Sequence, residues 1–295
     1  MNAEPVLTYV YAVASVTPGL ADAVAGLHGV GGAPVALLTA PGGLGRDGGE
    51  GAEASEDPAT AAFVVSPVPA SQWREEALKA HFEDLDWLEA TARAHHHVIQ
   101  ALMDHTTVLP LRMATLYEDD GRALDALRGQ RRSFADRLSL LARHAEYGVK
   151  VYVRPGTATP AAGPEPPAPQ PASPGKAYLQ ARRAQHHAQE DRYGQARQAA
   201  ERIAATAARY ATHVVRHPAQ TGSLARDDSG ENVLNDAFLV PDGQAEAFRT
   251  AVREAGEDLP GVRIEVTGPW APYSFAVPPP GPAEPAGPGD RLRGT

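Results

Sequence analysis

The chain has 295 residues, enough for two domains, and a net charge of −9 with a pI of about 5.7. This acidic balance disfavours nucleic acid as a main partner, because phosphate binding requires a basic face. The absence of cysteine excludes disulfides, thiolate catalysis and cysteine zinc sites and is consistent with a cytoplasmic location, and neither a signal peptide nor a bilayer-spanning apolar run is apparent.

The first part of the chain alternates strands with helical segments. Residues 6–13 are rich in β-branched and aromatic side chains and predict a strand, and the Thr-Pro pair that opens residues 17–27 predicts a short helix. Further strands are predicted at residues 34–38 and 61–66. Between them, residues 42–60 are rich in glycine and acidic residues and predict a flexible loop.

Helical periodicity dominates the next part. Ser71 is expected to cap a helix, and apolar spacing predicts a longer helix over residues 84–105. Its expected buried face comprises Leu85, Leu88, Ala92, His95, Ile99, Leu102 and Thr106. Another long helix is predicted over residues 120–147, ended by Gly148.

An extended, mostly apolar run lies between these two helices, at residues 107–115. Pro110 indicates an edge strand, a bulge or a bend, because proline cannot donate to a β-ladder. Arg112 within such a run usually needs a carboxylate partner. Two interpretations of Arg112 are therefore open, a structural ion pair and a partner-binding residue.

The rest of the chain predicts a second domain after a linker rich in proline and alanine. A strand at residues 149–153 precedes the linker. The elements expected after it are a helix over 176–217 stopped by Pro218, a strand at 232–240, a helix over 243–255 and a strand at 262–267. The fold class is α+β, with domains at 1–154 and 175–275, the linker at 155–174 and a disordered tail at 276–295. Each domain is expected to be a small mixed or antiparallel sheet covered by helices, and the β-α-β spacing favours a ferredoxin-like sheet.

Residues 267–275, Thr-Gly-Pro-Trp-Ala-Pro-Tyr-Ser-Phe, follow the last predicted strand. Gly268 and Pro269 are expected to end that strand. Trp270, Tyr273 and Phe275 then crowd together in a chain with 6% aromatic residues. They are interpreted either as a structural staple over a core or as a rigid aromatic patch offered to a partner.

The sequence contains no motif that is specific to a catalytic reaction or to a metal site. The three histidines at 95–97 are adjacent and therefore diverge around a helix, whereas helical zinc pairs use positions i and i+4. The glycine-rich stretches lack the context of a nucleotide-binding loop, and no hydrolase or metalloprotease motif is present. We therefore expect no catalytic residue, no metal and no cofactor.

Residues 268–275 resemble the C-terminal motif of the gas vesicle protein L/F family. Other segments similar to family blocks follow the family's order, at residues 9–11 with 64–68, 107–112, 175–179 and 235–240. The chain departs from the pattern at Met113-Ala114-Thr115, where the family usually has Phe-Gly-Thr, and at Ala271, where proline is common.

The resemblance implies two α+β domains, the second a modified ferredoxin-like fold with a long helix. It also implies a non-catalytic accessory protein, cytoplasmic and at the gas vesicle, that binds the small apolar shell protein and other accessory proteins during assembly. The motif residues that are candidates for partner binding are Leu109, Pro110, Leu111, Arg112, Thr115, Gly268, Pro269, Trp270, Tyr273 and Phe275.

We hypothesise that the N-terminal domain holds the shell protein around residues 107–115. Two other classes of function stay open. One is a small-ligand-binding regulatory protein with ferredoxin-like domains. The other is a hydrolase, which requires a pocket holding acid and base groups with perturbed pKa values.

Overall fold

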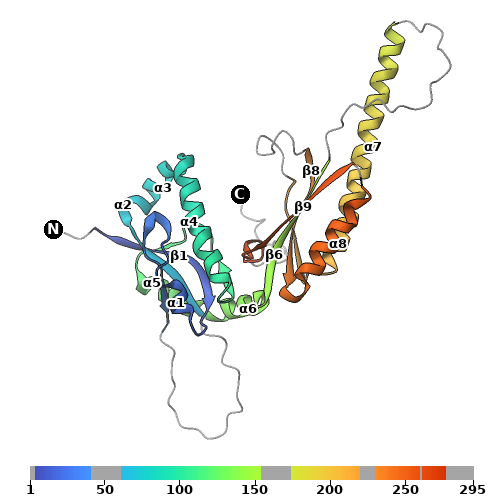
Figure 1. The fold of residues 1–295 in the computed structure, drawn as a ribbon. Coiled ribbons are helices and arrows are strands. Elements are labelled where there is room, and N and C mark those ends of the chain that lie inside the picture. The colour runs from blue at the N-terminus through green and yellow to red at the C-terminus, as the bar shows by residue number, and fades with distance from the viewer. Residues whose placement is uncertain (1–3, 41–60, 154–173, 220–229, 260, 277–295) are drawn as a thin grey trace, which may run out of the picture. The chain divides into compact units, whose positions relative to one another are not determined.

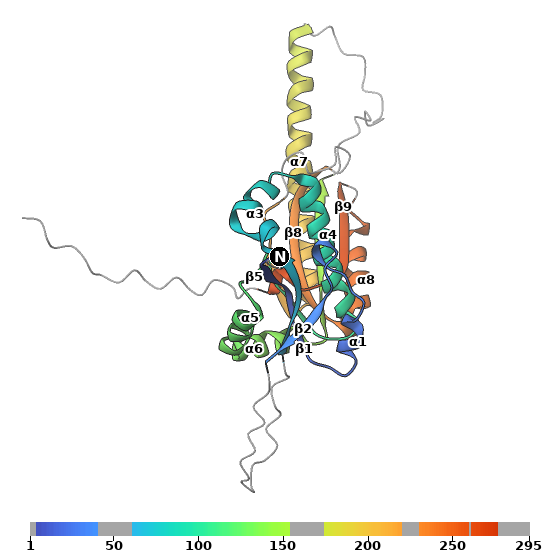
Figure 2. The ribbon, with the colours of Figure 1, turned by 90° about the vertical axis from the view of Figure 1, so that its left-hand side faces the viewer.

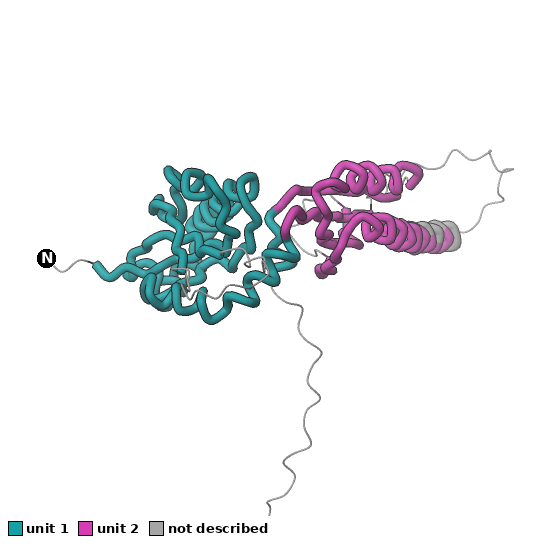
Figure 3. The backbone as a smooth tube through the Cα atoms, turned by 90° about the horizontal axis from the view of Figure 1, so that it is seen from below, with its two compact units in different colours: residues 1–141, 271–295 teal, residues 142–270 magenta. Residues whose placement is uncertain are grey.

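The computed structural model describes residues 4–40, 61–153, 174–219, 230–259 and 261–276. The chain divides into two compact units, shown in different colours in Figure 3. The first unit comprises residues 1–141 and 271–295, and the second comprises residues 142–270. The loop predicted at 42–60, the linker at 155–174 and the tail at 276–295 lie outside the described residues, apart from Pro174 and Ala276.

The first unit is built on an antiparallel sheet with the strand order β2-β3-β1-β4, in which β5 also pairs with β1. Its strands are β1 (Val6–Ser15), β2 (Ala36–Thr39), β3 (Ala61–Pro69), β4 (Val108–Pro110) and β5 (Leu116–Tyr117). Its helices are α1 (Leu20–Val24), α2 (Ala70–Trp73), α3 (Glu75–His81), α4 (Leu85–Met103), α5 (Asp120–Gly129) and α6 (Arg131–Leu141), with short 3₁₀ turns at Val30–Gly32 and Tyr273–Phe275.

Helices cover both faces of this sheet. On one face, α1 and α4 pack over Tyr9 and Tyr11 of β1, which are fully buried. On the other face, α5 and α6 pack against β3, where the rings of Phe63 and Phe134 meet edge to face at 5.7 Å. Figure 2 shows the sheet between these two helical layers. The sheet is therefore buried on both sides, which explains the nearly continuous apolar run of β3.

The second unit has the order β6-α7-β7-β8-α8-β9 and an antiparallel sheet with strands in the order β7-β8-β6-β9. Its strands are β6 (His144–Val153), β7 (His213–Arg216), β8 (Glu231–Pro241) and β9 (Val262–Trp270). Its helices are α7 (Pro174–Ala208) and α8 (Ala245–Glu257), with a 3₁₀ turn at Asp242–Gln244. Both helices pack on the same face of the sheet (Figure 1). This is the ferredoxin-like arrangement, so the predicted α+β class is confirmed.

The structure places the boundary between the units elsewhere than the sequence predicted. The strand expected at residues 149–153, at the end of the N-terminal domain, is β6, which lies at the centre of the second sheet between β8 and β9. Residues 271–276, expected in the C-terminal domain, belong to the first unit.

The helix predicted over residues 120–147 was wrong in its second half. It consists of α5 and α6 and ends at Leu141, and Tyr147 and Gly148 lie in β6. Gly148 is not a helix stop. A Cβ atom at this position would lie 2.7 Å from the Oγ1 of Thr267, so glycine permits the close approach of β9.

Four smaller predictions were also wrong. Ser71 lies inside α2 and Arg74 precedes α3, so Ser71 caps neither helix. Leu85 is 78% exposed and Ala92 is exposed too, whereas the buried side of α4 comprises Thr91, His95, Val98, Ile99 and Leu102. The helix expected to reach residue 217 ends at Ala208, because the β-branched pair within residues 213–216 joins the sheet as β7.

The fourth concerns the last strand. Gly268 and Pro269 do not end it, because β9 continues to Trp270, which pairs with Glu146. Within the described ranges, no helix combines the length and apolar character needed to span a bilayer.

Candidate functional site

The segment 107–115 follows the edge of the first sheet and then leaves it. As predicted, it begins as a short edge strand, β4, whose Pro110 pairs with Ala12. The amide of Leu111 still donates to the carbonyl of Tyr11 at 2.9 Å, and the carbonyl of Thr115 accepts from Val10 at 2.9 Å. Residues 111–115 therefore form a short excursion between two anchored ends. We call it the Arg112 turn.

The turn is closed by its own hydrogen bonds. The Thr115 amide and hydroxyl both donate to the carbonyl oxygen of Arg112, at 3.2 and 2.7 Å. Ala114 has a φ of 61°, in the left-handed region that side chains disfavour. The backbone here is thus held in one strained conformation, and such conformations persist only where surrounding contacts fix them.

His95 of α4 supplies those contacts together with Tyr9 of β1. The Nε2 of His95 lies 3.2 Å from the carbonyl oxygen of Leu111, which can only accept, so Nε2 carries the proton. Nδ1 then accepts from the Tyr9 hydroxyl at 2.8 Å, and that hydroxyl accepts from the Ala114 amide at 3.2 Å. One buried pair of side chains thus holds both ends of the strained part of the turn.

Burial determines the charge state of this pair. Desolvation lowers the pKa of His95 to about 4, and it raises the pKa of Tyr9 above its ordinary value. His95 is therefore neutral near pH 7, and both of its ring nitrogens are engaged. It positions the turn, and its hydrogen bonds leave neither nitrogen available to a ligand.

The C-terminal segment of the first unit reaches the same histidine. Ala271 is fully buried in the first core, and Phe275 is 5% exposed. The ring of Tyr273 stacks on His96 at 6.1 Å and lies 6.5 Å from the ring of His95. Phe275 is therefore a structural staple, whereas Tyr273 stays 36% exposed at the surface.

Two of the motif segments found in the sequence, more than 150 residues apart, thus meet at His95. Leu109 and Pro110 are buried within β4, whereas Arg112 is exposed. Among the residues that the structure describes, Arg112 forms no ion pair, so the geometry gives no support to the ion-pair interpretation. We call the exposed side chains of Arg112 and Tyr273, with His96 beneath the tyrosine ring, the Arg112–Tyr273 surface.

The sequence reasoning missed the supporting role of His95 and Tyr9. The signal was partly present, because helical spacing placed His95 on the predicted buried face of its helix. The residue to which it binds is a backbone carbonyl in another segment, and no periodicity reveals such a contact.

The other motif residues, Gly268, Pro269 and Trp270, belong to the second unit. Gly268 has a φ of 112°, and a Cβ atom there would lie 2.6 Å from the carbonyl oxygen of Glu146. Its own carbonyl accepts from Nη2 of Arg249 at 3.2 Å. Gly268 is therefore required by backbone geometry, and Trp270, 42% exposed, is the surface residue of this group.

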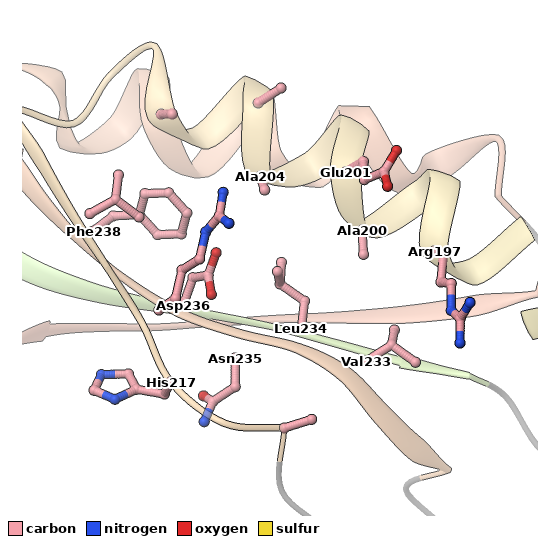
Figure 4. Close-up of a pocket in the computed structure, with 15 residues that line it drawn as sticks. Arg197, Ala200, Glu201, Ala204, His217, Val233, Leu234, Asn235, Asp236 and Phe238 are labelled. Atoms are coloured by element: carbon pink, nitrogen blue, oxygen red, sulfur yellow. The ribbon is translucent and has the colours of Figure 1, made fainter. Parts of the chain in front are cut away.

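The second unit also contains a groove of about 800 Å³ between α7 and β8. Figure 4 shows Leu234 and Asp236 pointing from β8 toward α7, whereas Asn235 and His217 lie on the other side of the strand. Burial raises the pKa of Asp236, and the nearby charges of Arg216 and His217 oppose this rise.

Comparison with known proteins gives consistent results. A family model described as gas vesicle synthesis protein GvpL/GvpF matches residues 7–277. Gas vesicle protein L of Streptomyces sp. (strain CB03234) is 38% identical over 270 residues, which are 92% of each chain.

Two solved structures are similar in fold. The crystal structure of gas vesicle protein GvpF from Anabaena sp. PCC7120 matches with a TM-score of 0.57 and 13% identity over 93% of this chain and 97% of that one. GvpF from Microcystis aeruginosa matches with a TM-score of 0.54 and 15% identity over 92% of this chain and 99% of that one.

Proposed function

Because the chain belongs to the GvpL/GvpF family of gas vesicle synthesis proteins, we propose that it binds the small apolar shell protein through the Arg112–Tyr273 surface. In this proposal it acts without catalysis, in the cytoplasm and at the gas vesicle, and it also contacts other accessory proteins during assembly. The family membership supports an accessory role in gas vesicle formation. The binding surface is our inference from the geometry.

The physical need for such a protein is clear. A shell subunit that will form a gas-facing wall exposes apolar surface before it is incorporated, and such surface aggregates. An acidic chain with a net charge of −9 resists self-association. Tyrosine and arginine, both exposed on the proposed surface, are among the residue types that most often dominate binding energy at interfaces. The chain can therefore cover an apolar subunit transiently.

One observation carries the proposal. Arg112 and Tyr273 come from two segments that the His95 cluster fixes from beneath, while their own side chains remain exposed. A rigid, solvent-facing pair loses little conformational entropy on binding. The left-handed backbone of Ala114 costs stability, and strained conformations of this kind are concentrated at functional sites.

The proposal is tested in the full-length chain, because the fold divides neither at residue 154 nor at residue 175. Tagged protein is co-expressed with the shell protein, and the shell protein retained on the tag is quantified. We expect Arg112→Glu and Tyr273→Ala each to weaken retention by about 5- to 30-fold in affinity, the effect of losing about 1–2 kcal/mol.

Arg128→Glu provides the control for charge, because Arg128 is an exposed arginine of the first unit that lies on α5, where its partner among the described residues is the exposed carboxylate of Asp125, one helical turn away. It makes the same change of charge away from the proposed surface. If Arg112→Glu and Arg128→Glu lost retention equally, the loss would come from the change in net charge. The assignment of shell-protein binding to the Arg112–Tyr273 surface would then be refuted.

A further inference from the structure

The groove between α7 and β8 contains a buried carboxylate, that of Asp236, with one oxygen that accepts no hydrogen bond within the described residues. Asp236 is 4% exposed, and its Oδ2 accepts no hydrogen bond from any residue in the described part of the chain. Most buried polar atoms in proteins are paired, because leaving one unpaired costs free energy. Since this side chain points from β8 toward α7 into the groove, the missing partner can come from outside the chain (Figure 4).

The walls around this carboxylate are apolar and leave room. Ala200, Ala204 and Ala208 form the helical wall, and their methyl groups fill little of the space between α7 and the sheet. The wall on the sheet side comprises Leu234, Phe238 and Val214. Val214 is 42% exposed, so apolar surface continues to the edge of the groove. An occupant therefore needs an apolar portion as well as a group that pairs with the carboxylate.

Charges at the rim limit what enters. Arg197, Arg216 and His217 line the rim together with Glu201. Arg216 is the register partner of Asp236, and the charges of Arg216 and His217 act on the Asp236 carboxyl without cancelling the effect of its burial. These basic side chains repel a cluster of positive charges. The groove therefore favours an occupant with a single cationic group.

We propose that the α7–β8 groove binds one lysine or arginine side chain, presented by an apolar segment of a partner protein, with Asp236 as its counter-ion. The long hydrocarbon stem of such a side chain suits the alanine wall while its charged end reaches the carboxylate. Burial raises the pKa of Asp236, and a paired cation would lower it again. This site lies in the second unit and goes beyond the proposed shell-protein surface of the first.

The test uses the full-length protein and a synthetic peptide, acetyl-Ala-Leu-Lys-Leu-Ala-amide, in isothermal titration calorimetry. The same peptide with glutamine in place of lysine is the neutral control, and n-butylammonium is the free-amine control. We expect the lysine peptide to bind more tightly than the glutamine peptide by about tenfold or more, the value of a charge-assisted hydrogen bond.

Three variants locate the binding. Asp236→Asn removes the charge and is expected to weaken binding of the lysine peptide by about tenfold or more. Ala204→Leu fills the groove without touching the carboxylate and is expected to abolish binding. Asp242→Asn, an exposed aspartate of the same unit, is expected to leave binding unchanged. Thermal unfolding of each variant confirms that it is folded before the titration is interpreted.

Equal binding of the lysine and glutamine peptides would overturn the proposal, and so would unchanged binding by either Asp236→Asn or Ala204→Leu. Binding of n-butylammonium as tight as that of the lysine peptide would also overturn it, because the apolar segment around the lysine would then contribute nothing and the groove would be assigned to a small amine. None of these outcomes depends on the shell protein, so the result is independent of the Arg112–Tyr273 surface.

Discussion

The Nε2 of His95 donates to the carbonyl oxygen of Leu111 at 3.2 Å, so a residue of α4 fixes the start of the Arg112 turn. The other nitrogen of the same ring accepts a hydrogen bond from the hydroxyl of Tyr9, and this hydroxyl accepts one from the amide of Ala114. The conformation of this turn therefore depends on one buried histidine as well as on the hydrogen bonds from Thr115 to Arg112 within the turn.

Replacing His95 tests this dependence. His95→Phe keeps a ring in the core but leaves the Leu111 carbonyl and the Tyr9 hydroxyl without their partners. We expect the free energy of unfolding to fall by about 2–4 kcal/mol, the cost of unpairing two buried polar groups. Denaturant titration measures this loss. The control is His97→Phe on the exposed side of α4, and an equal loss there would contradict the account.

The lowered pKa of His95 predicts a dependence of stability on pH. Its folded pKa is about 4 and its ordinary value is 6.5, so between these values the unfolded state binds more protons than the folded state. Stability therefore falls as the pH drops from about 6.5 toward 4, and the share due to His95 is about 2 kcal/mol between pH 8 and pH 5.

Denaturant titrations at pH 8 and pH 5 measure this share as the difference between the native chain and His95→Gln. Glutamine does not titrate, so the variant is expected to lose less stability on acidification. An identical loss for both proteins would show that His95 is not the group responsible.

Ala114 offers a prediction of increased stability. Its φ of 61° costs an alanine about 1–2 kcal/mol, a cost that glycine does not have. Part of this gain is lost, because glycine also raises the conformational entropy of the unfolded chain. We expect Ala114→Gly to raise the free energy of unfolding by about 0.5–1 kcal/mol. Ala90→Gly, at an exposed position inside α4, is the control and is expected to destabilise by about 1 kcal/mol. Destabilisation by both changes would rule out backbone strain at Ala114.

Replacing Gly268 is expected to have the opposite effect, a loss of stability. Alanine there would combine a φ of 112° with a Cβ atom 2.6 Å from the Glu146 carbonyl oxygen. We expect Gly268→Ala to destabilise the protein by at least about 2 kcal/mol, whereas Gly243→Ala, where an added Cβ meets nothing within 4 Å, has little effect. Thermal unfolding of the two variants provides the comparison, and similar midpoints would contradict it.

The sequence predicted the elements whose periodicity is local. The strand opening the chain, the helix ending near Met103 and the ferredoxin-like second sheet are confirmed, as is the resemblance to the gas vesicle family. Gly148 was misread because the same residue ends helices and admits close strand contacts. The distinction depends on Thr267 of β9, which is distant in sequence.

The candidate site was predicted only in part. The motif residues of segments 107–112 and 268–275 were identified, but their shared attachment to His95 was not. That attachment needs the return of residues 271–276 to the first unit, a long-range contact that leaves no local pattern. The unbonded oxygen of Asp236 was also not predicted, because the sequence indicated only a strand at residues 232–240 and not which side chains of that strand are buried.

The central claim is that the Arg112–Tyr273 surface holds the shell protein, and site-specific crosslinking tests it most directly. The chain has no cysteine, so Met113→Cys, next to Arg112 in the turn, introduces a single thiol that carries a photo-crosslinker and leaves Arg112 and Tyr273 intact. Arg128→Cys does the same away from the surface. With co-expressed shell protein, we expect a strong adduct from Met113→Cys and at most a weak one from Arg128→Cys. Adducts of equal yield, or one from Arg128→Cys alone, would contradict the account.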